Sequence, residues 1–264
     1  MFYFLSCFLL ACQTPLEEGQ KALENHDLVL AELSFREAIQ LDPNDQKAIA
    51  GLGWTYHLAL EKLMAAQSFE RCLQLNEQNI ECMRGRASVA LAQQDTQLAE
   101  RWLQKAETIA PEDPEISLSR ALLDLSLGEN EKAHDSLEAI TRRFPERSEF
   151  RLTYAESLLR NKRFEEALKQ TELALSDEKL LARYQVMCWI LRVRILLEGS
   201  AGVLQAECSQ KNNVWKWVLE AERSLGEAKA VGIAIPNIAV IQRQIGRRKN
   251  DILAKCPNSL EKID

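Results

Sequence analysis

The sequence has few histidines, few glycines and no excess of basic residues. Its 264 residues include 3 His, 10 Gly and 7 Pro, and its formal net charge is −6. It contains no glycine-rich phosphate loop, no GxSxG turn and no pair of histidines at metal-binding spacing. An acidic chain without a broad basic surface is also poorly suited to bind nucleic acid. We therefore expect a protein that is not an enzyme, that needs no cofactor, metal or small-molecule substrate, and that does not bind nucleic acid.

The seven cysteines form no CxxC pair, which argues against a structural zinc site. Cys72 occupies a position that is small or aliphatic in the repeat described below, so we interpret it as a small core residue. Cys208 and Cys256 both lie in the irregular C-terminal part of the chain. A disulfide between them is possible in an oxidising compartment, and the sequence leaves that pairing open.

Long hydrophobic runs are missing as well. The apolar stretch at the start, residues 1–12, is too short to span a bilayer. It ends in a small residue and the chain turns polar at Gln13, which is typical of a secretion signal and its cleavage site. The alternative interpretation is an apolar tail that docks on the rest of the protein, and no Lys or Arg precedes the apolar run.

Residues 9–12, Leu-Leu-Ala-Cys, resemble the lipobox of bacterial lipoproteins. This resemblance implies that residues 1–11 are a signal peptide, that the chain is cut before Cys12, and that Cys12 is acylated. Two or three acyl chains are enough for stable membrane anchoring. Gln13 rather than Asp follows the cysteine, which in that family implies an anchor in the outer membrane that faces the periplasm.

What the sequence does contain is a repeat of 34 residues. Five copies follow one another without insertion or deletion, which is the mark of a stacked repeat protein. Within each copy apolar residues recur at spacings of three and four, so each copy predicts two helices. Prolines 43, 111 and 145 end three of the copies. The recurring residues are Ala31, Ala65, Ala99, Ala133 and Ala167; four residues later Phe35, Phe69, Leu103, Leu137 and Thr171; and seven residues later Ala38, Cys72, Ala106, Ile140 and Ala174.

This pattern resembles the tetratricopeptide repeat, a pair of antiparallel helices. The second copy shows it best, with Ile49, Leu52, Gly53, Tyr56, Ala65, Phe69 and Cys72 at the family's positions. The small residues permit two helices to cross closely, and each pair leaves an apolar face for the next pair to cover. The resemblance implies an all-α, right-handed superhelical solenoid with five regular repeats over residues 12–179.

Residues 180–264 depart from the regular repeat. The apolar stretch around Trp189 predicts the first helix of a sixth pair. Glycines at 199 and 202 are costly inside a helix, and the alanine signature returns about twenty residues late, at Ala221, Leu225 and Ala228. We therefore expect an irregular sixth pair with an insertion at about 199–213. A last helix from about residue 235 to 255 is expected to cap the array.

The family resemblance also implies a concave surface, lined by first helices, that holds a peptide or a partner helix. The positions that face this surface are mostly apolar or acidic, so a clamp of Lys, Asn and Arg for a terminal carboxylate is absent. We expect a partner with an apolar or amphipathic segment. Several of these leucines could instead pack between neighbouring first helices. The candidate groove residues are Trp54, His57, Leu58, Arg84, Leu91, Leu118, Leu122, Leu125, Leu152, Glu156 and Leu159.

Two hypotheses remain for the function. The first is a lipid-anchored scaffold on the periplasmic side of a bacterial outer membrane, which assists assembly or localisation of an envelope complex, of the pilus-secretin or outer-membrane-assembly type. The second is a soluble cytosolic adaptor or regulator of the same repeat family, without a lipid anchor. The state of Cys12 distinguishes the two.

Overall fold

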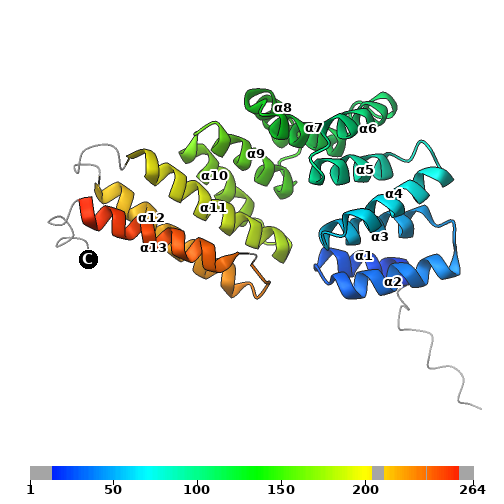
Figure 1. The fold of residues 1–264 in the computed structure, drawn as a ribbon, viewed down its shortest axis with the longest axis horizontal. Helices are drawn as coiled ribbons and strands as arrows, with labels where there is room; N and C mark the ends of the chain where they lie inside the picture. Colours follow the sequence, from blue (N-terminus) through cyan, green and yellow to red (C-terminus); the bar gives the residue numbers. More distant parts are fainter. Residues whose placement is uncertain (1–13, 204–210, 236, 256–264) are drawn as a thin grey trace, which may run out of the picture. The chain divides into compact units, whose positions relative to one another are not determined.

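The computed structural model describes residues 14–203, 211–235 and 237–255 (Figure 1). The regular secondary structure in these ranges is helical throughout, which confirms the predicted all-α class. The helices are α1 (Pro15–Glu24), α2 (Leu28–Leu41), α3 (Gln46–Leu58), α4 (Lys62–Leu75), α5 (Ile80–Ala92), α6 (Thr96–Ile109), α7 (Pro114–Leu127), α8 (Asn130–Arg143), α9 (Ser148–Arg160), α10 (Phe164–Leu175), α11 (Ala182–Val203), α12 (Lys211–Ala230) and α13 (Ile238–Lys255).

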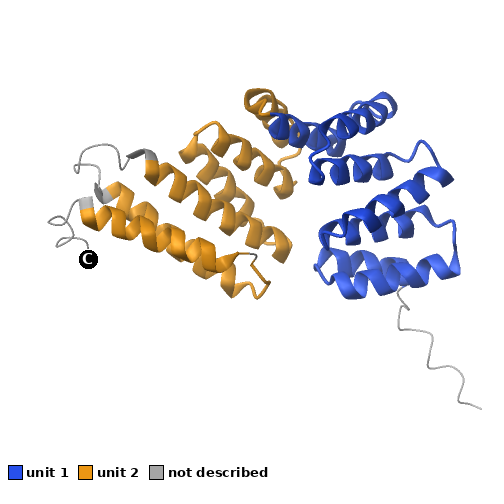
Figure 2. Cartoon of the chain, viewed as in Figure 1, with its two compact units in different colours: residues 1–127 blue, residues 128–264 orange. Residues whose placement is uncertain are grey.

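The chain divides into two compact units, residues 1–127 and residues 128–264 (Figure 2). Unit 1 holds α1 to α7 and unit 2 holds α8 to α13. The division falls between the two helices of the fourth predicted repeat. The sequence pattern changes near residue 179 instead, so the end of the regular repeats and the boundary of the compact units are different features.

Helix starts recur with the period of the repeat. Asp45, Asn79 and Asp113 stand 34 residues apart, and each carboxylate or amide oxygen accepts a hydrogen bond from a backbone N–H in the first turn of the helix that follows. Such caps satisfy amide groups that a helix leaves unpaired at its start. The first helices α3, α5 and α7 of unit 1 therefore begin where the chain supplies a capping side chain.

Consecutive helices of unit 1 pack on one another, both within a pair and from one pair to the next. Ala31, Ala65 and Ala99 are fully buried on the second helices, as the repeat predicts. Phe35 lies between two glycines: a Cβ at Gly19 would meet its ring at 2.8 Å and a Cβ at Gly51 at 2.4 Å. Only a residue without a side chain lets the ring come so close, so the glycines set the distance between the helices.

The same arrangement follows one repeat later. The ring of Phe69 lies between Gly53 of α3 and Gly85 of α5, where added Cβ atoms would meet it at 2.7 and 2.3 Å. Both phenylalanine rings are fully buried. In this part of the array each large ring on a second helix therefore packs against a glycine of its own first helix and a glycine of the next first helix.

Unit 2 continues the helix pairs. α8 packs on α9, α9 on α10, α10 on α11 and α11 on α12. Ala221, Leu225 and Ala228 are buried on α12, as expected for the second helix of a sixth pair. The final helix, α13, packs on α12 and, over a smaller area, on α11. Ile245 and Ile252 are the buried residues of its inner face.

The predicted insertion at 199–213 is wrong at its start. α11 continues as a helix through Gly199 and Ser200 to Val203, and α12 begins at Lys211. The reason is contact rather than helix propensity: a Cβ at Gly199 would meet the ring of Trp217, on α12, at 2.1 Å. The glycine that suggested a helix break is a position where a tryptophan packs directly against the helix backbone.

The turn between the two helices of a pair also repeats. Residues 26, 60, 94, 128 and 162 stand 34 apart and all have a positive φ. Glycine adopts this left-handed conformation freely, whereas in other residues it raises the conformational free energy. Only the fourth position is a glycine, Gly128 with φ 81°, and Leu60 has φ 64° with 79% of its surface exposed. Leu60 is therefore both strained and without packing that would offset the strain.

Candidate functional site

The candidate groove residues of unit 1 lie on its first helices. Trp54 of α3 is half-buried, and its ring meets that of Phe69 edge to face, with an interplanar angle of 72° and a centroid distance of 5.1 Å. His57, one turn along α3, meets the same tryptophan edge to face at 5.7 Å. Burial lowers the pKa of His57, because the charged imidazolium would lose its hydration. Trp54 and His57 therefore form an aromatic surface on α3 that stays neutral near pH 7.

Arg84 of the next first helix, α5, extends this surface. Its guanidinium carbon lies 5.9 Å from the centroid of the Trp54 ring, which is cation–π distance. Its Nη2 donates to Oε2 of Glu115 on α7 at 2.8 Å. Three successive first helices are thus connected through one arginine. A charge-assisted hydrogen bond of this kind is stronger than a neutral one, so it holds the guanidinium in place beside the Trp54 ring.

The leucines of the candidate set divide by exposure. Leu58 is 37% exposed and Leu122 is 40% exposed, whereas Leu91 and Leu118 are half-buried. Leu125 is buried, so it belongs to the core and is removed from the site. We name the remaining residues the α3–α5–α7 surface: Trp54, His57, Leu58, Arg84, Leu91, Leu118 and Leu122.

The candidates of unit 2 fit the site less well. Leu152 and Leu159 are buried, which matches the alternative that leucines pack between first helices. Glu156 of α9 is half-buried, and its carboxylate accepts hydrogen bonds from Arg194 of α11 at 2.8 Å and from Arg160 at 3.2 Å. In unit 2, therefore, the Glu156 carboxylate forms an ion pair that connects two first helices, α9 and α11.

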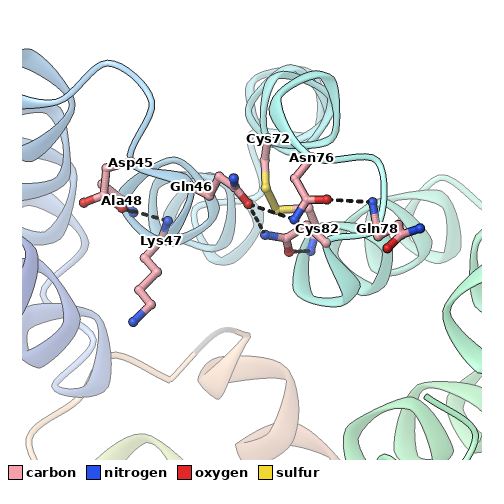
Figure 3. Close-up of a disulfide and its surroundings, with 9 residues drawn as sticks. Asp45, Gln46, Lys47, Ala48, Cys72, Asn76, Gln78 and Cys82 are labelled. Atoms are coloured by element: carbon pink, nitrogen blue, oxygen red, sulfur yellow. Dashed lines mark hydrogen bonds between the residues drawn. A yellow bond between two sulfur atoms is a disulfide. The ribbon is translucent and has the colours of Figure 1, made fainter. Parts of the chain in front are cut away.

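A disulfide that the sequence reasoning missed joins the second and third helix pairs. Cys72, near the end of α4, is bonded to Cys82, in the first turn of α5, with their Cα atoms 6.3 Å apart (Figure 3). Both residues are fully buried. The interpretation of Cys72 as a mere core residue is therefore incomplete. The sequence does place Cys72 at the end of one predicted helix and Cys82 at the start of the next, which is the feature that could have indicated the disulfide.

Amide side chains hold the turn beside this disulfide. Oε1 of Gln46 accepts hydrogen bonds from Nδ2 of Asn76 at 3.3 Å and Nδ2 of Asn79 at 3.0 Å. Asn79 in turn accepts from the backbone N–H of Cys82 at 3.1 Å. Hydrogen bonds to Gln46 therefore connect the start of α3 to the α4–α5 turn, beside the disulfide that joins α4 to α5 (Figure 3).

One further cysteine, Cys188, lies in the described residues. Cys188 of α11 is a free thiol, and burial raises its pKa to about 12, so it is unreactive near neutral pH. The predicted lipid site at Cys12 and the possible Cys208–Cys256 pair lie outside the described residues. Within the described ranges, no helix has the length and apolar character to cross a bilayer. The same ranges hold no cluster of three or more potential metal-ligating side chains.

The family comparison matches the helix pairs. The model of the tetratricopeptide repeat matches residues 55–114 and 118–178. The chain contains tetratricopeptide repeats. Among solved structures, a tetratricopeptide repeat protein from Parabacteroides merdae is similar, with a TM-score of 0.65 and 15% identity over 89% of this chain and 83% of the other. At this identity the likeness shows the fold alone.

Two further proteins are similar to parts of this tetratricopeptide-repeat chain. The structure of pilF from Pseudomonas aeruginosa aligns with a TM-score of 0.53 and 18% identity over 79% of this chain and 89% of that one. Cellulose synthase operon protein C from Pseudomonas fluorescens (strain SBW25) is 31% identical over 122 residues, 46% of this chain. The chain spans about a tenth of that relative's length.

Proposed function

We propose that this protein is a non-enzymatic scaffold that binds a partner protein on the α3–α5–α7 surface. The observation behind this proposal is the combination of aromatic, apolar and guanidinium groups on three successive first helices. Trp54 offers a large aromatic ring and Arg84 a guanidinium group beside it. Leu58 and Leu122 add exposed apolar surface. Tryptophan and arginine dominate the binding energy of many protein interfaces. An apolar or amphipathic segment with a carboxylate suits this surface.

We propose further that the scaffold works outside the cytoplasm, held by lipid on Cys12. The buried Cys72–Cys82 disulfide supports this location, because disulfides persist in oxidising compartments and are rare in the cytosol. The lipobox-like residues 9–12 support it independently. An anchor confines the protein to a surface and raises its effective concentration near an envelope complex, so weak binding is sufficient.

The proposed anchor leads to a proposal for the envelope process. Assembly of a pilus-secretin or outer-membrane complex is our working proposal. The partial similarity to cellulose synthase operon protein C suggests a complex of the cellulose synthase operon as another candidate. In each case the scaffold would bring a partner to the outer membrane.

The anchor and the compartment are tested together. Cells that express the wild type are labelled with a radioactive fatty acid, and thiols are trapped by alkylation before lysis. We expect label on the wild type, none on Cys12→Ala, and no alkyl group on Cys72 or Cys82, because a disulfide does not react with the alkylating agent. The second hypothesis is a cytosolic adaptor without a lipid anchor. It requires an unlabelled protein with both thiols reduced, and that result would remove the envelope proposal.

Binding on the α3–α5–α7 surface is tested with exposed residues. Leu58→Glu with Leu122→Glu places two charges on it, and both residues are exposed enough to change without loss of the fold. Leu63→Glu on α4, at 68% exposure, is the matched control. Crosslinking in the native envelope should capture a specific partner with the wild type and the control but not with the double variant. Equal capture by all three proteins contradicts this assignment.

A further inference from the structure

A recessed surface lies in unit 2, outside the residues that match the family model. A pocket of about 560 Å³ opens between α11 and α13. We call it the α11–α13 groove. Its floor is apolar, with Ile190 and Leu197 from α11 and Val240 and Ile241 from α13. It arises because α13 packs mainly on α12 and only lightly on α11.

The groove runs along both helices. Its residues on α11 extend from Ile190 to Ala201 at spacings of three and four, which places them on one helix face. Eleven residues at 1.5 Å each correspond to about 16 Å of groove. Val240 is 41% exposed although it is apolar. Although α13 is expected to cap the array, it leaves this face of α11 uncovered.

Three arginines and two acidic residues also line the groove. Arg247 and Arg248 of α13 line it, and neither has an ion-pair or hydrogen-bond partner among the residues that the structure describes. Arg194 lines the opposite wall, where it is bridged to Glu156. Glu198 and Asp251 also line the groove. The α13 segment contains five basic residues and one acidic residue, in a chain whose net charge is −6.

This combination selects one kind of occupant. Unpaired guanidinium groups bind carboxylates through two parallel hydrogen bonds. The recessed apolar floor, walled by two helices, accepts side chains of a peptide, whereas a flat bilayer surface cannot enter it. Nucleic acid is disfavoured because the floor is apolar and acidic side chains also line the groove.

We propose that the α11–α13 groove binds an acidic amphipathic segment of a partner protein. The apolar side chains of the segment lie on Ile190, Leu197 and Val240, and its Asp or Glu side chains pair with Arg247 and Arg248. This site is separate from the α3–α5–α7 surface and from the lipid anchor, and it does not depend on the compartment. The scaffold would then hold two partners at once.

The test begins with the full chain and a library of displayed random peptides of about twelve residues, a length that can follow the groove. Selected peptides are labelled with fluorescein and titrated by fluorescence anisotropy. We expect them to combine Leu, Ile or Phe with Asp or Glu. Arg247→Glu with Arg248→Glu should weaken their binding by about tenfold or more, as reversal of close charge pairs does. Ala201→Trp, which fills the groove, should weaken it as well.

Two controls make the result specific. Arg223→Glu changes an exposed arginine of α12 that does not line the groove, and it should leave binding unchanged. Leu58→Glu with Leu122→Glu should also leave it unchanged, which separates this site from the proposed function. Three results would overturn the proposal. The first is that no selected peptide binds saturably, and the second is that both groove variants bind the peptides as well as the wild type does. The third is that the protein binds only phosphatidylglycerol vesicles and that the arginine variant abolishes this binding.

Discussion

In both the second helix pair of unit 1 and the sixth pair in unit 2, a large aromatic ring packs against a glycine of a neighbouring helix. The ring stands at a different position of the repeat in the two pairs. In unit 1 the ring of Phe69 on a second helix packs against Gly53 and Gly85 on first helices. In unit 2 the ring of Trp217 on α12 packs against Gly199 of α11. The phenylalanine follows its alanine, Ala65, by four residues, whereas the tryptophan precedes its alanine, Ala221, by four. Close approach of two helices thus needs a glycine opposite a large ring, and the repeat register is only one way to supply it.

The third repeat shows what happens when the ring is lost. Leu103 stands where Phe69 stands one repeat earlier, and Ala87 stands where Gly53 stands. Leu103 and Ala87 are both fully buried and belong to one core cluster. A smaller side chain on the second helix is matched by a larger one on the first, so the total volume at the crossing is kept.

The largest expected effect comes from adding one methyl group in unit 1. The Cβ of Gly85→Ala would lie 2.3 Å from the Phe69 ring, so the helices must move apart. We expect a loss of about 3 kcal/mol of stability, the upper part of the range for overpacking. Urea unfolding followed by circular dichroism measures it. Phe69→Leu in the same chain should restore much of the loss, and an equal loss in the double variant would contradict the ring–glycine explanation.

The next largest effect is expected from the disulfide. It joins two helix pairs of unit 1, whereas the one described cysteine of unit 2 is a free thiol. Cys72→Ala with Cys82→Ala removes a link across a separation of 10 residues. We expect a loss of about 2–3 kcal/mol from the greater freedom of the unfolded chain. Hydrogen exchange should rise in α4 and α5. Reduction of the wild type should produce the same change, and Cys188→Ala serves as the unbonded control.

Gly199→Ala tests the same rule in unit 2. Its Cβ would lie 2.1 Å from the Trp217 ring. We expect a loss of about 2 kcal/mol, relieved by Trp217→Leu. Gly226→Ala on the exposed side of α12 is the matched control, since nothing lies within 4 Å of its added Cβ. It should gain about 0.5–1 kcal/mol, because alanine is the better helix former. A gain at Gly199 as well would mean that the glycine is not a packing position.

The smallest effect concerns the turns within helix pairs, at two equivalent positions of the repeat, Leu60 in unit 1 and Gly128 in unit 2. Leu60→Gly relieves a left-handed conformation that costs leucine about 1–2 kcal/mol, but glycine gains freedom in the unfolded chain. We expect a net gain of about 0.5 kcal/mol. The reverse change in unit 2, Gly128→Leu, should lose about 1 kcal/mol. Thermal unfolding of the two variants should shift in opposite directions, and shifts of the same sign would contradict this account.

Much of the fold could be predicted because it is local. The period of 34, the buried alanines and the late return of the signature at Ala221 and Ala228 all follow from helical spacing, which places residues three and four apart on one face. The exposure of the candidate groove residues followed the prediction only in part, and their role in binding stays a prediction. Trp54, Arg84 and Leu122 lie on accessible first-helix faces, whereas Leu125, Leu152 and Leu159 are buried. Helix position alone does not say which neighbour covers a side chain.

The sequence by itself determined the helix pairs, their order and the small residues at their crossings, because each depends on contacts within a repeat or between adjacent repeats. Only the tertiary structure decided that Cys72 meets Cys82, that α11 continues through Gly199, and that α13 leaves a groove open beside α11. A disulfide, a ring against a glycine and a groove all require two elements at a particular distance and orientation. Those distances are set by how whole helices pack, which no single stretch of residues specifies.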